Sequence, residues 1–319
     1  HAADASAEFG SISEIQTFNL IVANAADVVV NGAFHADVDD ITVTGGNTTS
    51  TFTTGTLGAG VETLDASGFS GNILATVAND ALDSTVTFTG GGTATDKVLN
   101  TVATAATTYA LKSTGVELLD LDINAAATTT VSLAAATGVT GVSVDLGANV
   151  AAITATISNV TDEVITLKAV NTTTANHILA ASLVSATGTT DTIAFKMGAG
   201  TIAAGAKLKT DDVETVSINV AAAASLDLSL LAMTTAGKTM ALTTTGATAL
   251  TVTALGTDVT SIDASGMGVG GSVTQTGRTS TDAATYTGSA GADTFMMLNK
   301  GDVLTGGAGV DTLDINFAA

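Results

Sequence analysis

The residues of this chain best suited to chemistry are three aspartates near its end, nine residues apart. They are Asp293, Asp302 and Asp311, and each is followed two positions later by a large apolar residue. Carboxylate oxygens are the ligands that hard cations such as Ca²⁺ prefer. An apolar residue two positions further on suits a strand in which alternate side chains face a core. The spacing therefore predicts acidic turns that bind a cation and lead directly into buried strands.

Glycines precede two of these aspartates. Segments 288–293 and 306–311 read Gly-Ser-Ala-Gly-Ala-Asp and Gly-Gly-Ala-Gly-Val-Asp. They approach the nonapeptide Gly-Gly-x-Gly-x-Asp-x-U-x (U is large and apolar) that is typical of calcium-binding turns in a parallel β-helix. Two nonapeptides make one coil of about 18 residues, so we expect Asp293 and Asp311 on one edge and Asp302 on the other. The candidate calcium-binding residues in this run are Asp293, Asp302, Asp311, Asp314, Gly288, Gly291, Gly306, Gly307 and Gly309.

The other candidate turns depart from this pattern. Met297 and Lys300 stand where the Asp302 turn would have glycines, which leaves open whether an ion or Lys300 supplies the positive charge there. Gly91 and Asp96 form a degraded copy at 91–98, for which a calcium site and an ordinary turn both remain open. Turn hydrogen bonds explain the acids of the longer repeats as well as metal binding does. These weaker candidates are Asp65, Asp120, Asp122 and Asp263, together with the cluster Asp37, Asp39 and Asp40.

The charge and composition of the 319-residue chain restrict its partners. It has 30 acidic and nine basic residues, for a net charge of −21, and 24 of the acids are Asp. This balance disfavours nucleic acid and anionic membrane surfaces and favours cations. No cysteine is present, which excludes disulfides and thiolate metal sites. Since no run of eighteen apolar residues occurs, the sequence predicts no membrane span.

A recurring unit organises most of the chain. Copies of a segment such as Val-Glu-Thr-Leu-Asp-Ala-Ser lie at 61–67, 116–122, 213–219 and 259–265. In three copies an Asp-led element precedes the glutamate by 21 to 23 residues; the pairs are Asp40 and Glu62, Asp96 and Glu117, and Asp191 and Glu214. Alternating β-branched residues predict strands at each copy. Such units bury an apolar face only by stacking on their neighbours.

We therefore predict an all-β fold, an elongated and irregular parallel β-helix or β-solenoid that ends in a short calcium-binding β-roll. Segments 128–136 and 221–233 are rich in Ala and Leu, but they also alternate, which favours strands over helices. A change in composition near 277–285 suggests a repetitive assembly region at 1–280 and a calcium-binding segment at 281–319. His at position 1 suggests a mature product or a fragment of a longer chain.

Signatures of catalysis are missing from the sequence. The three histidines are His1, His35 and His177, and no His-Glu-x-x-His stretch occurs. Neither a Gly-x-Ser-x-Gly elbow nor a Gly-Lys-Ser/Thr phosphate loop is present. The sequence therefore predicts a protein that is not an enzyme.

The terminal nonapeptides, together with the Val-Glu-Thr-Leu-Asp units, resemble the RTX-type surface-layer proteins of Gram-negative bacteria. The resemblance implies Ca²⁺-dependent folding, type I secretion and assembly of identical copies into a two-dimensional lattice on the cell surface. It also implies attachment to surface polysaccharide or lipopolysaccharide, through a region that the sequence does not identify. The chain departs from the family in having few complete nonapeptides, which leaves the number of calcium sites open. An RTX adhesin or filament subunit, and an accessory RTX domain of a secreted hydrolase, are the alternatives.

Overall fold

The structure of the chain is a computed structural model. It describes residues 5–7, 14–23, 27–30, 37–57, 60–77, 86–92, 95–102, 108–123, 128–147, 151–170, 176–278, 280, 282–297 and 299–315. Two of the three histidines, His1 and His35, lie outside these residues. The chain divides into two compact units, residues 1–143 and 144–319.

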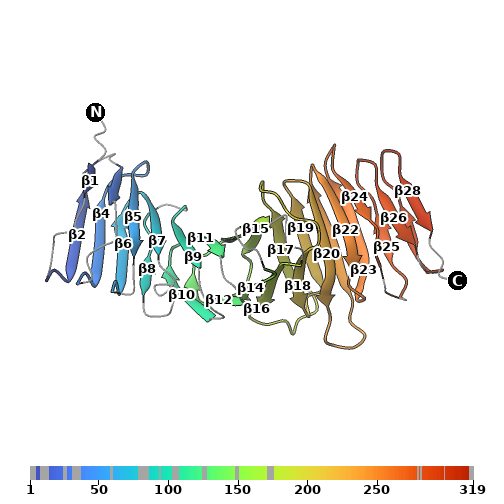
Figure 1. Ribbon diagram of the computed structural model, residues 1–319, viewed down its shortest axis with the longest axis horizontal. Helices are drawn as coiled ribbons and strands as arrows, with labels where there is room; N and C mark the ends of the chain where they lie inside the picture. The colour runs from blue at the N-terminus through green and yellow to red at the C-terminus, as the bar shows by residue number, and fades with distance from the viewer. Residues whose placement is uncertain are drawn as a thin grey trace. The chain divides into compact units, whose positions relative to one another are not determined.

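Both units are parallel β-solenoids, and the described residues contain strands but no helix. Successive strands enter two different sheets in turn, so odd-numbered strands pair with odd-numbered ones and even-numbered with even-numbered ones. Among the described residues these strand pairings are parallel, as when β17 pairs with β19. Figure 1 shows the strands of each unit stacked side by side along its axis. The predicted fold class is confirmed.

The strands of the first unit are β1 (Ala5–Ala7), β2 (Thr17–Val22), β3 (Val28–Val30), β4 (Asp40–Gly45), β5 (Thr51–Leu57), β6 (Thr63–Phe69), β7 (Asn72–Val77), β8 (Thr87–Thr89), β9 (Lys97–Val102), β10 (Thr108–Thr114), β11 (Leu118–Ile123) and β12 (Thr129–Thr137). Strand β13 (Gly141–Leu146) crosses the boundary between the units.

The strands of the second unit are β14 (Thr154–Val160), β15 (Val164–Val170), β16 (Ile178–Leu183), β17 (Thr192–Met197), β18 (Ala206–Asp211), β19 (Thr215–Val220), β20 (Ala224–Ala232), β21 (Met240–Gly246), β22 (Ala249–Leu255), β23 (Val259–Met267), β24 (Ser272–Gln275), β25 (Thr285–Thr287), β26 (Thr294–Met297), β27 (Val303–Thr305) and β28 (Thr312–Ile315). Strands β12 and β20 confirm that the Ala- and Leu-rich segments 128–136 and 221–233 are extended.

The core of each unit consists of columns of aligned apolar side chains. Alternate residues of a strand face inward, and the register places them directly above those of the neighbouring coil. One such column in the second unit runs through Ile193, Val216, Leu242, Ile262 and Tyr286. All five side chains are buried. Each contributes roughly 1.5–3 kcal/mol relative to an exposed side chain, so the column joins successive coils as well as filling them.

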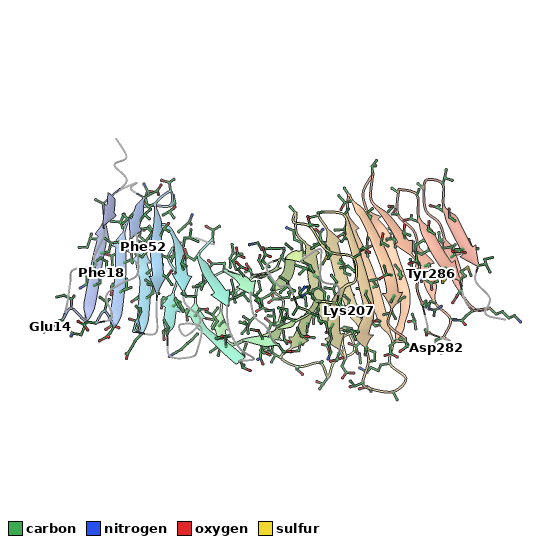
Figure 2. All side chains as sticks on the ribbon, viewed as in Figure 1. Glu14, Phe18, Phe52, Lys207, Asp282 and Tyr286 are labelled. Atoms are coloured by element: carbon green, nitrogen blue, oxygen red, sulfur yellow. The ribbon has the colours of Figure 1, made fainter. Side chains whose placement is uncertain are left out.

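The core of these coils is narrow, and few aromatic residues are needed to fill it. Phe52 in the first unit and Tyr286 in the second are fully buried, and both are labelled in Figure 2. Tyr286 packs on Phe295, with ring centroids 5.3 Å apart. The described residues have no helix long or apolar enough for a membrane crossing.

The sequence repeats correspond to coils. Their leading valines, at 61, 116, 213 and 259, are all buried. In three copies the strand begins two residues after the valine, at Thr63, Leu118 and Thr215. The 281–319 segment expected as a separate part continues the same sheets, since β23 pairs with β25 and β24 with β26. Its boundary at 280/281 falls inside the second unit.

Candidate functional site

The carboxylate of Asp293 holds together two turns of backbone. Asp293 lies just before β26, and its Oδ1 accepts the N–H of Val273 at 2.6 Å, one coil earlier. Its Oδ2 accepts the N–H of Ser289 at 2.6 Å, at the start of its own turn. The Ser289 hydroxyl donates to the same carboxylate at 2.9–3.1 Å. Because Asp293 is only 1% exposed, these donors rather than water solvate its charge.

The next coil repeats this contact. Asp311 precedes β28, and its Oδ1 accepts the N–H of Asp293 at 3.1 Å. The pairing of Thr294 with Thr312 places the two aspartates on the same edge, 18 residues apart. Asp302 precedes β27, which belongs to the other sheet. The expected arrangement of the three aspartates on the two edges is therefore confirmed.

The same contact recurs earlier in the chain. Asp96 accepts the N–H of Ile73 at 2.7 Å. Glu117 in turn accepts the N–H of Asp96 at 3.0 Å. Glu214 accepts the N–H of Asp191 at 3.1 Å. The Asp-to-Glu spacing of 21 and 23 residues in the sequence thus corresponds to one coil. The glutamate accepts the backbone N–H of the aspartate one coil earlier.

We call these acids the carboxylate ladder. Each stands immediately before a strand and accepts the N–H of the residue at the paired position one coil earlier. Its members are Asp96, Glu117, Glu214, Asp293, Asp302 and Asp311. In Asp96, Asp293 and Asp302 the second oxygen also receives an N–H from the same turn; the donors are Gly91, Ser289 and Asn299.

The ladder concentrates negative charge inside the turns. Burial raises the pKa of Asp96 above its ordinary value, against the lowering effect of the N–H donors Ile73 and Gly91. Burial also raises the pKa of Glu117, and the neighbouring charge of Asp96 adds to that rise. Ionising both groups is therefore costly, and a nearby cation would lower that cost.

Two built-in cations serve other parts of the ladder. Lys238 donates to Glu214 at 2.7 Å and to the carbonyl of Gly188 at 2.6 Å. The hydrogen bond from Lys238 is the main reason why the pKa of Glu214 lies below its ordinary value. Asp302 accepts Arg278 Nη1 at 2.9 Å, and both side chains are 0% exposed. Arg278 is the only arginine of the chain, and nothing in the sequence pattern pointed to it.

The turns at Asp293 and Asp311 fit calcium in their donor types. Gly307 and Gly309 have φ of +97° and +107°, which only glycine adopts without strain. A Cβ at either position would clash with a carbonyl oxygen, of Ser289 and Gly291 respectively. The turn 306–309 thus packs directly on the turn 288–291, and its surroundings supply backbone carbonyls and carboxylates, the oxygen donors that calcium takes.

The availability of those carboxylates differs along the run. The oxygens of Asp293 already receive two backbone N–H groups and a hydroxyl. Those of Asp302 receive Arg278, Ala284 and Asn299, so the guanidinium stands where a metal ion would. Among the described residues, no three His, Cys, Asp or Glu side chains group closely enough to hold a metal ion. Calcium at the edge of Asp293 and Asp311, between the turns that begin at Gly288 and Gly306, stays a prediction.

The remaining candidates do not belong to the carboxylate ladder. Asp65 in β6 and Asp263 in β23 each accept the N–H two residues on at 2.9 Å, so both make a short-range backbone contact but lie within strands and not in turns. Asp37 accepts the N–H of Glu14, and Asp40 accepts the hydroxyl of Thr63. Asp314 is exposed within β28 and not in a turn. Asp120 and Asp122 lie within β11.

His177 occupies a ladder position without being an acid. It precedes β16, and its Nδ1 accepts the N–H of Ile153, the paired residue one coil earlier, at 3.4 Å. Its Nε2 is buried with no hydrogen-bond partner among the described residues. Burial lowers the pKa of His177. Only its place directly before a strand could have marked this histidine in the sequence.

Comparison of the chain with family models, with curated proteins and with solved structures gives no match.

Replacing Asp293 by Asn tests the ladder. One amide oxygen can accept only one of the two backbone N–H groups, and the amide NH₂ then faces the other. We expect the free energy of unfolding at one fixed calcium concentration to fall by about 1–3 kcal/mol, with faster hydrogen exchange at Val273. Asp263→Asn, which alters an exposed acid with a local contact, is the control. Equal effects of both variants would contradict the ladder.

Replacing Arg278 by Met leaves the Asp302 carboxylate buried without its cation. We expect a loss of about 3–5 kcal/mol in the free energy of unfolding, because an uncompensated buried charge is strongly destabilising. The double variant Arg278→Met/Asp302→Asn should recover part of this loss, and Lys300→Met should change little. Denaturant titration measures all three, and a double variant no more stable than Arg278→Met would show that the pair is not coupled.

His177 predicts a pH dependence. Its pKa is lower in the folded protein than the ordinary value of about 6.5, so below that pH the unfolded chain binds the proton more readily. The stability that neutral His177 contributes is fully present above about pH 6.5. It falls as the pH decreases toward the pKa of His177 in the folded protein, by less than roughly 1.4 kcal/mol per pH unit. His177→Gln keeps an acceptor and does not titrate, so its stability should fall less over this range. Identical pH profiles would exclude a role for His177.

Proposed function

We propose that this chain is a structural domain of an extracellular assembly of the surface-layer type, whose final coils respond to calcium. The observation that carries the proposal is the carboxylate ladder, which joins one coil to the next and ends in the closely stacked turns at Asp293 and Asp311. A scaffold of stacked coils with acids inside its turns suits a mechanical role in which cations regulate folding.

In this proposal the negative charge of the chain makes its folding depend on calcium. With a net charge of −21, the unfolded chain repels itself and resists compaction where calcium is scarce. Where calcium is abundant, neutralising a turn carboxylate favours the folded state, because metal binding and folding are coupled. This fits a protein that is secreted unfolded, by a type I system, and folds outside a Gram-negative cell.

The residues that would hold the ion are in the last two turns of one edge. Asp311 supplies a half-buried carboxylate, and backbone carbonyls of the glycine-rich turns 288–291 and 306–309 supply neutral oxygens. Calcium there would compensate the charges of Asp293 and Asp311, as Arg278 compensates Asp302 on the other edge. In the degraded turn of Gly91 and Asp96, a cation would relieve the repulsion between Asp96 and Glu117.

The partner in assembly is a second copy of the chain. Parallel sheets with short Thr, Ser and Ala side chains pointing outward give each coil a similar surface, and repeated surfaces suit repeated contacts between identical subunits. A lattice on the cell surface, attached to polysaccharide through another region, is the form that the family resemblance favours.

Removal of calcium tests this function. We expect excess chelator to unfold the terminal coils, which reduces the strand signal in circular dichroism. Light scattering should show that the assembly disperses, and millimolar calcium should restore both signals. Asp311→Asn should raise the calcium concentration needed, while Asp314→Asn, an exposed acid on the next strand, should not. Strand signal and assembly that both persist in excess chelator would sink the proposal, and electron microscopy distinguishes sheets from fibres.

A further inference from the structure

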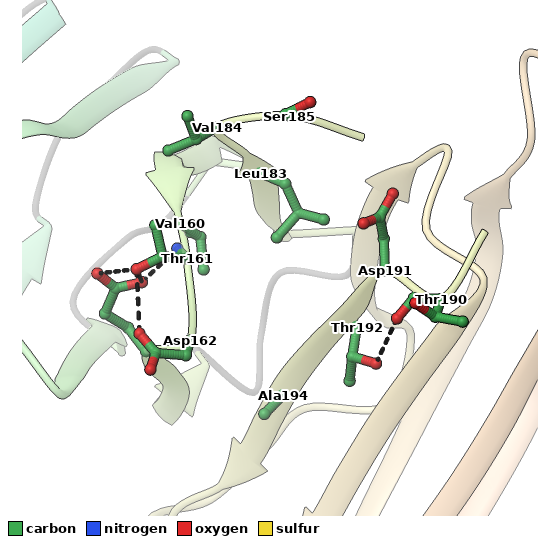
Figure 3. A pocket seen from close by; sticks show the side chains of 11 residues that line it. Val160, Thr161, Asp162, Leu183, Val184, Ser185, Thr190, Asp191, Thr192 and Ala194 are labelled. Atoms are coloured by element: carbon green, nitrogen blue, oxygen red, sulfur yellow. Dashed lines mark hydrogen bonds between the residues drawn. The ribbon is translucent and has the colours of Figure 1, made fainter. Parts of the chain in front are cut away.

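A pocket of about 500 Å³ lies in the second unit, on one edge of two successive coils. This is within the range of roughly 300–1,000 Å³ found for small-molecule sites. One wall is the turn between β14 and β15, and the other is the loop between β16 and β17. Figure 3 shows Thr161 and Asp162 on the first wall, Asp191 on the second, Leu183 between them, and Val184 above the first wall.

The pocket opens where the ladder is interrupted. Val164 pairs with Ala194, and the same register extended back by three residues places Thr161 opposite Asp191. At a ladder position Asp191 would accept the N–H of Thr161. That N–H instead goes to Glu163 of the same turn at 2.6 Å, while Asp191 accepts the N–H of Gly188 from its own loop at 2.9 Å. The two turns therefore do not close on each other.

Both walls are held in place. Glu163 is only 6% exposed, and the hydroxyl of Thr161 donates to it as well. The opposite loop is fixed by Lys238, which donates to the carbonyl of Gly188 and to Glu214. Glu214 in turn accepts the N–H of Asp191 at 3.1 Å. The cavity is thus a preformed feature of the folded unit.

The lining combines separated acids with an aliphatic floor. Its carboxylates are Asp162, Glu163 and Asp191, and the floor includes Val160, Leu183, Val184 and Ala194. Val184 is 60% exposed, so its side chain is open to contact by a ligand. No three acidic or His side chains of the described residues converge as ligands of one metal ion. The charges on the two walls therefore favour an extended ligand with a positive group at each end over a compact cation.

We propose that this pocket binds aliphatic diamines and polyamines. One ammonium group pairs with Asp162 and Glu163 and the other with Asp191, while the methylene chain covers Leu183 and Val184. The hydroxyls that line the pocket, among them Thr190 and Thr192, accept the remaining N–H groups. This binding does not depend on the proposed calcium-responsive assembly, because the pocket is built from other coils.

Putrescine and n-butylamine, which share a four-carbon chain, are the probes for a titration of the full chain at low ionic strength, followed by NMR. We expect putrescine to bind at least fivefold more tightly than n-butylamine and to shift the amide signals of Thr161 and Asp191. Added salt should weaken the binding of putrescine, since both of its contacts are ionic.

Variants locate the site. Asp191→Asn and Asp162→Asn should each weaken putrescine binding about two- to fivefold, the size expected for a partly exposed ion pair. Asp162 is exposed, so its variant keeps the test valid if Asp191→Asn disturbs the loop. Asp263→Asn makes the same change in charge elsewhere and should have no effect. Equal affinity for the two amines, or equal effects of all three variants, would overturn the proposal in favour of nonspecific attraction to an acidic surface.

Discussion

The hydrogen bond from a backbone N–H to an acid one coil later is the interaction on which this solenoid depends. A turn precedes each strand. At these positions an N–H group of one coil has no strand residue of the next coil to accept its hydrogen bond. An unpaired buried N–H group costs about 1–3 kcal/mol. Asp293 supplies the missing acceptor for Val273, and Asp311 supplies it for Asp293. Because the acid stands directly before its strand, the contact also fixes the register in which the apolar columns align.

This solution accumulates charge, and the structure balances it in different ways. Lys238 neutralises Glu214, and Arg278 neutralises Asp302. At Asp96 and Glu117 burial raises both pKa values, which indicates that ionising these two side chains costs free energy that no cation among the described side chains offsets. A histidine at position 177 avoids the charge altogether and makes a longer hydrogen bond, 3.4 Å against 2.6 Å at Asp293. The ladder is thus one structural device whose dependence on external cations varies from coil to coil.

The sequence predicted the β-solenoid and the edges of the three terminal aspartates, because alternation along a strand and an 18-residue period are both local patterns. It also recorded the spacing of Asp96 and Glu117, which proved to be one coil. It did not predict Arg278, whose partner Asp302 lies 24 residues further on without any repeat to connect them. The pocket was equally hidden, since it arises where the N–H of Thr161 and the carboxylate of Asp191 each bond within their own turn, which no residue type in the sequence indicates.

The hydrogen bonds of the ladder limit the carboxylates at which calcium could stabilise the fold. A carboxylate that already receives two backbone N–H groups gains less from a metal ion than a bare one, since the charge is partly solvated before the ion arrives. Asp293 is in that state, and Asp302 also has a guanidinium. Any response to calcium should therefore concentrate at Asp311, whose half-buried carboxylate faces the glycine turn 306–309, and at the strained pair Asp96 and Glu117. Coils between these points owe their cohesion to N–H donors and apolar columns, which act with or without the ion.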